Sequence, residues 1–306
     1  MSDTTDGVPP YLDQPVWYEP LRSPSWLLPK AEPDAPLIVF ATPAPPAHEA
    51  PEDRELREGL PMYLAEAVRY STAARTAVAF GGSTAAGAIH ADVLVAEAPE
   101  GRSLEVRLRG ASGDDLGTVI QPADDDAALG RGIGALPGAV AAALRPAGVR
   151  SVWSTVFQIP IETHATDYVR GYAVCRALRD PAIHRDVADD SEETARRRAS
   201  VDAAFRRLAD LSGRVTTPFA SMLFFAGLAA AHHHGNPAYL GYRLSANGRC
   251  TTATDPLDPV FRVSVLVFRM LGDPVIAGQR TRVLATAGDD DLARWLSRID
   301  DVTALV

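Results

Sequence analysis

Residues 91–121 read ADVLVAEAPEGRSLEVRLRGASGDDLGTVIQ, and this stretch decides the fold of the first half of the chain. Within it Leu104, Val106 and Leu108 alternate with polar or charged residues, which is the period of a strand buried on one side. Turn-forming residues precede this strand at 99–102 and follow it at 112–115. The sequence therefore predicts an antiparallel meander of three strands, with its aliphatic face buried and its charged face solvated.

The residues on either side of the meander predict two further strands and two helices. Residues 37–40 and 76–80 are short apolar runs of strand length. Between them, apolar residues recur at helical spacing from Leu60 onward. After the meander, the acidic residues at 124–126 suit the N-terminus of a helix whose apolar stripe begins at Leu129. The element order is therefore strand, helix, strand, three-strand meander and helix.

The second half of the chain has a different pattern, because from about residue 163 its apolar periodicity becomes mainly helical. Asp258-Pro259 and Asp273-Pro274 are typical of a helix N-cap followed by proline at the first helical position. One segment, 261–267, alternates as a strand would, but its setting among helices favours a helix. The predicted helices are 166–179, 192–211, 217–234, 257–271, 274–287 and 290–299.

The first 36 residues form a segment of their own. They carry eight prolines, a density that prevents a regular helix or a central strand. They also carry Trp17, Tyr18 and Trp26, and aromatic residues are unusual in a purely solvating disordered segment. Two alternatives follow. The tail packs along its own domain, or it docks on a partner protein and these three residues are the partner-binding residues.

Three motifs of the first half resemble those of a known protein domain. They are Gly59-Leu60 at a helix start, His90–Val95 leading into a hydrophobic strand, and Gly101–Leu108, a turn followed by a basic alternating strand. Together with the element order, they resemble the amino-terminal domain of the TolB-type periplasmic proteins, which is also found in the flagellar outer-membrane lipoprotein FlgO. The resemblance implies an α+β fold in which a mixed sheet with an antiparallel meander carries two helices on one face. It also implies an interaction or small-ligand module without chemistry of its own, and helical repeats of the tetratricopeptide type often follow such modules.

The chain is therefore expected to have three parts. A proline-rich extended tail occupies residues 1–36, an α/β domain occupies 37–158, and an all-helical domain occupies 159–306.

Composition argues against several classes of partner and location. The 306 residues carry a formal net charge of -9 and a pI near 5.3, whereas nucleic-acid binding draws its affinity from Lys and Arg on phosphate. The longest apolar run, 219–231, is about half of the ~20 residues needed to cross a bilayer. Cys175 and Cys250 fit neither a disulfide framework nor a cysteine-based zinc site. We expect a cytoplasmic protein without a membrane span or a nucleic-acid partner.

A glycine-rich run follows the predicted strand at 76–80 and includes Gly81 and Gly82. A nucleotide-binding P-loop needs a lysine at fixed spacing, and the only lysine of the chain is Lys30. These glycines with Trp153 nevertheless mark an alternative ligand site, in a cleft between the two halves.

Three consecutive histidines, His232 to His234, are the most conspicuous polar cluster. Adjacent residues of a helix point about 100° apart, so three in a row cannot converge on one metal ion from a regular helix. Gly235 follows them, which favours a helix C-terminus where imidazole meets the last carbonyl groups. The triplet His184-Arg185-Asp186 matches a kinase motif in letters only. The sequence predicts no metal site, no cofactor and no catalytic residues.

The function expected from the sequence is a non-enzymatic cytoplasmic interaction or scaffold protein, the accessory subunit of a larger assembly with a protein partner. The alternative is a sensor that binds a small molecule or nucleotide at Gly81, Gly82 and Trp153.

Overall fold

The computed structural model describes residues 11–32, 34–42, 49–80, 86–98, 101–152, 157–184, 192–215 and 217–303. These residues belong to two compact units. The α/β unit comprises Pro9–Pro15 and Pro29–Ala173, and the described residues of the helical unit lie within Val16–Leu28 and Val174–Val306. The sequence placed a boundary at 158, whereas the main division between the units follows Ala173.

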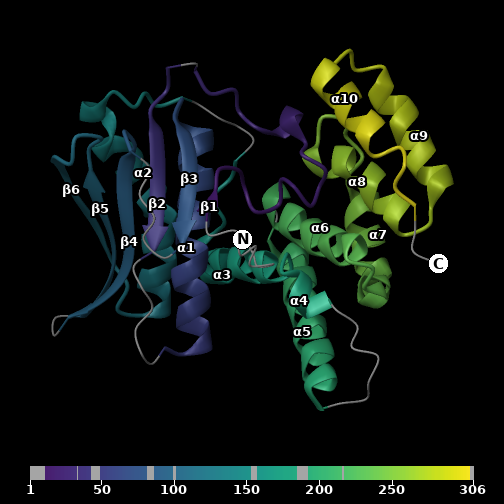
Figure 1. The fold of residues 1–306 in the computed structure, drawn as a ribbon, viewed down its shortest axis with the longest axis horizontal. Helices are drawn as coiled ribbons and strands as arrows, with labels where there is room; N and C mark the ends of the chain where they lie inside the picture. The colour runs from purple at the N-terminus through teal and green to yellow at the C-terminus, as the bar shows by residue number, and fades with distance from the viewer. Residues whose placement is uncertain are drawn as a thin grey trace, which may run out of the picture. The chain divides into compact units, whose positions relative to one another are not determined.

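The α/β unit is built on a six-stranded mixed sheet (Figure 1). Its order is β1 (Tyr11–Leu12), β3 (Arg75–Phe80), β2 (Leu37–Thr42), β4 (Ile89–Ala98), β5 (Gly101–Arg109) and β6 (Asp115–Pro122). Strand β2 is parallel to both β3 and β4, while β4, β5 and β6 pair antiparallel. The predicted meander and the mixed α+β sheet are confirmed.

Two helices cover one face of this sheet (Figure 1). Helix α1 (Pro51–Ser71) packs on β2 and β3, and α2 (Asp126–Ala143) packs on β5, β6 and α1. The side chains of Leu104, Val106 and Leu108 are fully buried, as their alternation predicted. The α+β fold with two helices on one face, followed by an all-helical region, is therefore the observed fold.

The second half of the chain is helical throughout its described residues. Its elements are α3 (Glu162–Ala177), α4 (Pro181–His184), α5 (Glu192–Arg214), α6 (Pro218–His233), the 3-10 segment η3 (Pro237–Tyr242), α7 (Arg243–Thr252), α8 (Pro259–Met270), α9 (Pro274–Ala285) and α10 (Asp290–Arg298). The ambiguous segment 261–267 lies in α8 and is a helix. Helix α7 was not predicted, because it buries only Ala246 and Cys250 and so carries too short an apolar stripe.

Within the described residues, no helix is both long enough and apolar enough to cross a membrane.

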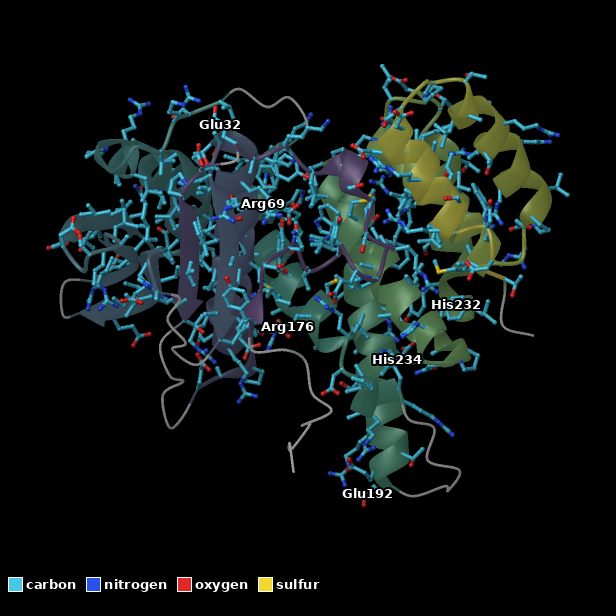
Figure 2. The ribbon with its side chains drawn as sticks, turned by 45° about the horizontal axis from the view of Figure 1, so that its top comes forward. Glu32, Arg69, Arg176, Glu192, His232 and His234 are labelled. Carbon is cyan, nitrogen blue, oxygen red and sulfur yellow. The ribbon has the colours of Figure 1, made fainter. Side chains whose placement is uncertain are left out.

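The predicted extended tail is divided between the two units. Tyr11 and Leu12 form β1 and pair antiparallel with Ala79 and Val78 of β3. Arg69 of α1, labelled in Figure 2, donates hydrogen bonds to the Gln14 side chain at 2.5 Å and to the carbonyl of Asp13 at 2.6 Å. Residues Val16–Leu28, which we call the strap, belong instead to the helical unit.

Helices α1 and α3 approach each other closely at Gly59. A Cβ atom placed on this residue would lie 2.0 Å from the backbone oxygen of Val169 in α3, well inside van der Waals contact. A backbone atom cannot swing aside as a side chain can, so glycine is required here by the approach of the two helices.

We predict that Gly59→Ala destabilises the protein by about 1–3 kcal/mol, because the added methyl group forces α3 away from α1. The matched control is Gly138→Ala in α2, where a Cβ atom meets nothing within 4 Å. There the better helix propensity of alanine should add up to ~1 kcal/mol. Urea unfolding followed by circular dichroism measures both variants. Equal stabilities for the two variants would contradict the close approach.

Candidate functional site: a histidine pocket in the helical unit

The three aromatic residues predicted to bind a partner all lie in the strap. Trp17 has no exposed surface and packs against Phe219 of α6, with the ring centroids 5.9 Å apart. Trp26 packs edge-on against Trp295 of α10, at 5.6 Å between centroids, while Tyr18 is half-buried. The structure thus places Trp17 in the core of the helical unit. Contact of these aromatic residues with a partner protein stays a prediction.

Gly81, Gly82 and Trp153, the residues of the alternative ligand site, lie outside the described residues. A ligand site built from them also stays a prediction.

Two side chains of α10 donate hydrogen bonds to backbone carbonyls of the strap. The indole N–H of Trp295 donates to the carbonyl of Leu21 at 2.9 Å, and the guanidinium of Arg298 donates to the carbonyl of Ser23 at 2.7 Å. Between these two anchors, Arg22 and Ser23 have φ angles of 59° and 56°. Two consecutive non-glycine residues in the left-handed region are strained, so surrounding contacts must hold them there.

The strap closes one side of a pocket of about 270 Å³ within the helical unit. Its polar lining comes from the strap, from the residue Arg179 beyond α3, and from the end of α6: Glu19, Arg22, Arg179, His232, His233 and His234. Its apolar wall comes from α6 and α8 and includes Ala229, Ala230, Leu266 and Met270. The sequence could not predict this pocket, because its walls come from segments far apart along the chain.

The three histidines lie at the C-terminus of α6, as predicted. Figure 2 labels His232 and His234 there. The N–H of His234 donates to the carbonyl of Ala230, and Gly235 adopts the left-handed conformation with a φ of 69°. This is the usual glycine-terminated helix end. His232 and His234 face the pocket from this end, together with the exposed His233.

The hydrogen bonds of His232 define its tautomer. The hydroxyl of Tyr239 donates to the carbonyl of Met270 at 3.1 Å, so it can only accept from Nδ1 of His232 at 3.0 Å. The Nδ1 atom therefore carries the proton in the neutral ring. The imidazole is held in one orientation at the pocket wall.

A fourth histidine, His184 of α4, is buried behind His234. Its Nε2 donates to the carbonyl of Leu178 at 2.6 Å, and its Nδ1 accepts from the amide of Asn236 at 3.3 Å. The rings of His184 and His234 stack with their centroids 5.1 Å apart. A second proton on His184 would leave the Asn236 donor facing another N–H group, so this arrangement favours a neutral ring.

Burial lowers the pKa of three of these histidines below the usual value. For His184, burial is the main cause, and a positive charge on His234 would lower the pKa further. For His232, burial is followed by the positive charge of Arg22. For His234, burial is followed by the neighbouring His233. All three rings are therefore neutral at pH 7.

The fixed charges of the pocket come from two arginines and one glutamate. Arg179 is almost buried, with 10% of its side chain exposed, and it forms an ion pair with Glu19, of which 69% is exposed. Arg22 is exposed, and among the described residues its guanidinium has neither a hydrogen-bond nor an ion-pair partner. With neutral histidines, the lining residues carry a net charge of about +1.

Two further sets of polar side chains are buried. In the α/β unit the Tyr168 and Tyr172 hydroxyls lie 3.0 Å apart, and Tyr172 is also hydrogen-bonded to the buried Glu66. Burial and Glu66 raise the pKa of Tyr172 well above its usual value. These groups hold α1 to α3. In the helical unit, burial raises the pKa of the Cys250 thiol to about 12, so it is no nucleophile at neutral pH.

Within the described residues, no group of three or more His, Cys, Asp or Glu side chains is arranged to hold a metal ion. Residues 185–190, including Asp186 next to His184, lie outside the described part of the chain.

We predict that Trp17→Ala destabilises the helical unit by about 3–5 kcal/mol, because it removes a fully buried indole from the contact with Phe219. Tyr18→Ala is the matched control in the strap, since Tyr18 is only half-buried and its loss should cost less. Chemical unfolding monitored by near-ultraviolet circular dichroism measures both. A cost for Trp17→Ala no larger than that for Tyr18→Ala would contradict a structural role for the strap.

We also predict that stability falls as the pH is lowered from 7.5 to 5.5. The folded-state pKa values of His184, His232 and His234 lie below those of the unfolded chain, so the unfolded state binds more protons once the pH falls through about 6.5. This contribution is complete above that pH and is lost below it. Thermal melts across this range measure the effect, and His184→Gln should flatten the dependence. A stability that stays level or rises on acidification would contradict the neutral histidines.

Comparison with known proteins identifies no relative. No family model matches the chain. No curated protein and no solved structure matches it either.

Proposed function

We propose that this protein is a non-enzymatic accessory protein whose helical unit binds a small ligand in the histidine pocket. The observation that carries the proposal is the make-up of the pocket. Arg22, Arg179, His232 and His234 line one cavity together with apolar residues of α6 and α8. Ligand sites typically combine such apolar residues with a few fixed polar groups.

The chemistry of the lining supports binding rather than catalysis. Among the described residues, the polar lining contains no Ser, Thr or Cys that a histidine could activate as a nucleophile. His232 is already hydrogen-bonded to Tyr239, and the Nε2 atom of His184 is hydrogen-bonded to Leu178. These bonds fix the rings in place and support a role in shaping the pocket.

The size of the pocket limits the ligand. A volume of about 270 Å³ is slightly smaller than typical ligand sites, which run from roughly 300 to 1,000 Å³. We therefore expect a small metabolite or an inorganic ion rather than a dinucleotide.

We further propose that the α/β unit contacts a protein partner and that the protein works in the cytoplasm as part of a larger assembly. The resemblance of this unit to the TolB amino-terminal domain supports an interaction role. The acidic net charge of -9 favours a protein partner over a nucleic acid. Cys175 and Cys250 are two buried cysteines, and so low a cysteine content is compatible with a reducing compartment.

We predict that a compound panel will contain a small ligand that raises the melting temperature of the full chain. A ligand at a hundred times its dissociation constant adds about 2.7 kcal/mol to stability. Ala230→Leu should abolish the shift, because Ala230 lines the pocket and leucine would fill it. Ala293→Leu is the matched control, since Ala293 is exposed on α10 and does not line the pocket.

Two outcomes of this screen would overturn the proposal. One is a ligand-induced shift that survives Ala230→Leu, which would place binding elsewhere. The other is no shift with any anionic, cationic or neutral compound of the panel.

A further inference from the structure

We propose that the ligand of the histidine pocket is a small oxyanion, a carboxylate or a phosphate, and that it binds by displacing the Glu19 carboxylate from Arg179. This inference rests on the proposed function of the pocket. Glu19 then competes with the oxyanion for Arg179.

The first support is the asymmetry of the Glu19–Arg179 ion pair. Only 10% of the Arg179 side chain is exposed, so leaving its guanidinium without an anionic partner is unfavourable. The Glu19 side chain is 69% exposed, so it regains water readily when it leaves. An entering oxyanion that takes the place of this carboxylate keeps Arg179 paired, at little cost to the protein.

The second support is Arg22, which gives the ligand a contact that Glu19 does not use. Arg22 lines the same pocket as Arg179, and its guanidinium is unpaired among the described residues. Its backbone φ of 59° is held by the hydrogen bonds of Leu21 to Trp295 and of Ser23 to Tyr18 and Arg298. Strained residues of this kind concentrate at ligand sites, because packing has to hold a side chain in a required place.

The partial negative charge at the C-terminus of α6 repels an anion. A helix C-terminus carries about half a negative charge. Its last carbonyls are already engaged, since the N–H groups of His234, Gly235 and Asn236 donate to Ala230, His232 and Ala231. Asp180 lies near His234, but its carboxylate accepts from the N–H of Ala182 at 2.9 Å and does not line the pocket.

The balance of charge therefore favours an anion. Arg22 and Arg179 contribute two positive charges, and Glu19 and the helix end together offset about one and a half of them. Once Glu19 leaves, the remaining positive charge of about one and a half faces the ligand. Two arginines at one small cavity are suited to the fork-like geometry of carboxylate and phosphate oxygens.

The test is isothermal titration calorimetry of the full chain at pH 7 and low salt, with inorganic phosphate, succinate and the neutral succinamide as probes. We expect phosphate or succinate to bind, the tighter of the two identifying the source of the oxyanion, and succinamide not to bind. Glu19→Gln should bind the anion about tenfold tighter, a factor within the usual range of coupling between two sites. Arg22→Gln should bind it more weakly by a similar factor.

Glu32→Gln is the matched control. It breaks the exposed ion pair between Glu32 and Arg150 in the α/β unit, and Figure 2 labels Glu32. It removes the same charge from the chain as Glu19→Gln, so it corrects for a change in overall charge. We expect its affinity for the anion to equal that of the unmodified protein.

Unchanged or weaker anion binding by Glu19→Gln would overturn the competitor role, and equal binding of succinamide would overturn the oxyanion class. If a neutral compound binds in a manner sensitive to Ala230→Leu while both anions fail, this inference falls and the pocket keeps its proposed function. If nothing binds, both fall. Thermal melts of each variant establish that it is folded.

Discussion

The strap is joined to the helical unit by a hydrogen bond between residues 274 positions apart, from the indole N–H of Trp295 to the backbone carbonyl of Leu21. It fixes the strap against α10 at the point where the backbone turns through Arg22 and Ser23. Trp17 adds a fully buried indole on the other side of that turn. The backbone hydrogen bonds within the strap form only short turns and the 3-10 segment Ser25–Leu27, so these tertiary contacts are what hold it against the helices. The position of Glu19 and Arg22 at the pocket follows from them.

Polar side chains are enclosed in the core of the α/β unit, whereas in the helical unit they line a cavity. In the α/β unit, Glu66 and its tyrosine neighbours are enclosed between α1 and α3, where their hydrogen bonds serve packing. In the helical unit, four histidines gather at the end of α6, and three of them line a cavity. A network enclosed between packed helices specifies a core, whereas polar groups around a cavity are available to a ligand. The proposed ligand site therefore lies in the helical unit.

The burial of the charged groups sets the chemistry of that cavity. Arg179 needs an anionic partner because it has little access to water, while Glu19 has ample access and does not need Arg179. Neutral histidines beside them supply shape and hydrogen bonds without adding charge. The pocket is consequently lined by both polar and apolar residues and is weakly positive. The group that pairs with Arg179 is the carboxylate of Glu19, which belongs to the strap.

The sequence by itself determined most of the helices and strands, but not α7. Alternation at Leu104, Val106 and Leu108 indicated the meander, and the glycine after His234 indicated the end of α6, because a strand period and a helix end are local patterns. Only the tertiary structure decided which distant elements meet: the strap with α10, His184 with His234, and Glu19 with Arg179. Periodicity shows that a residue faces inward but does not identify the residue it meets there. For that reason the fold could be predicted from the residues in order, whereas the pocket, assembled from segments at both ends of the chain, could not.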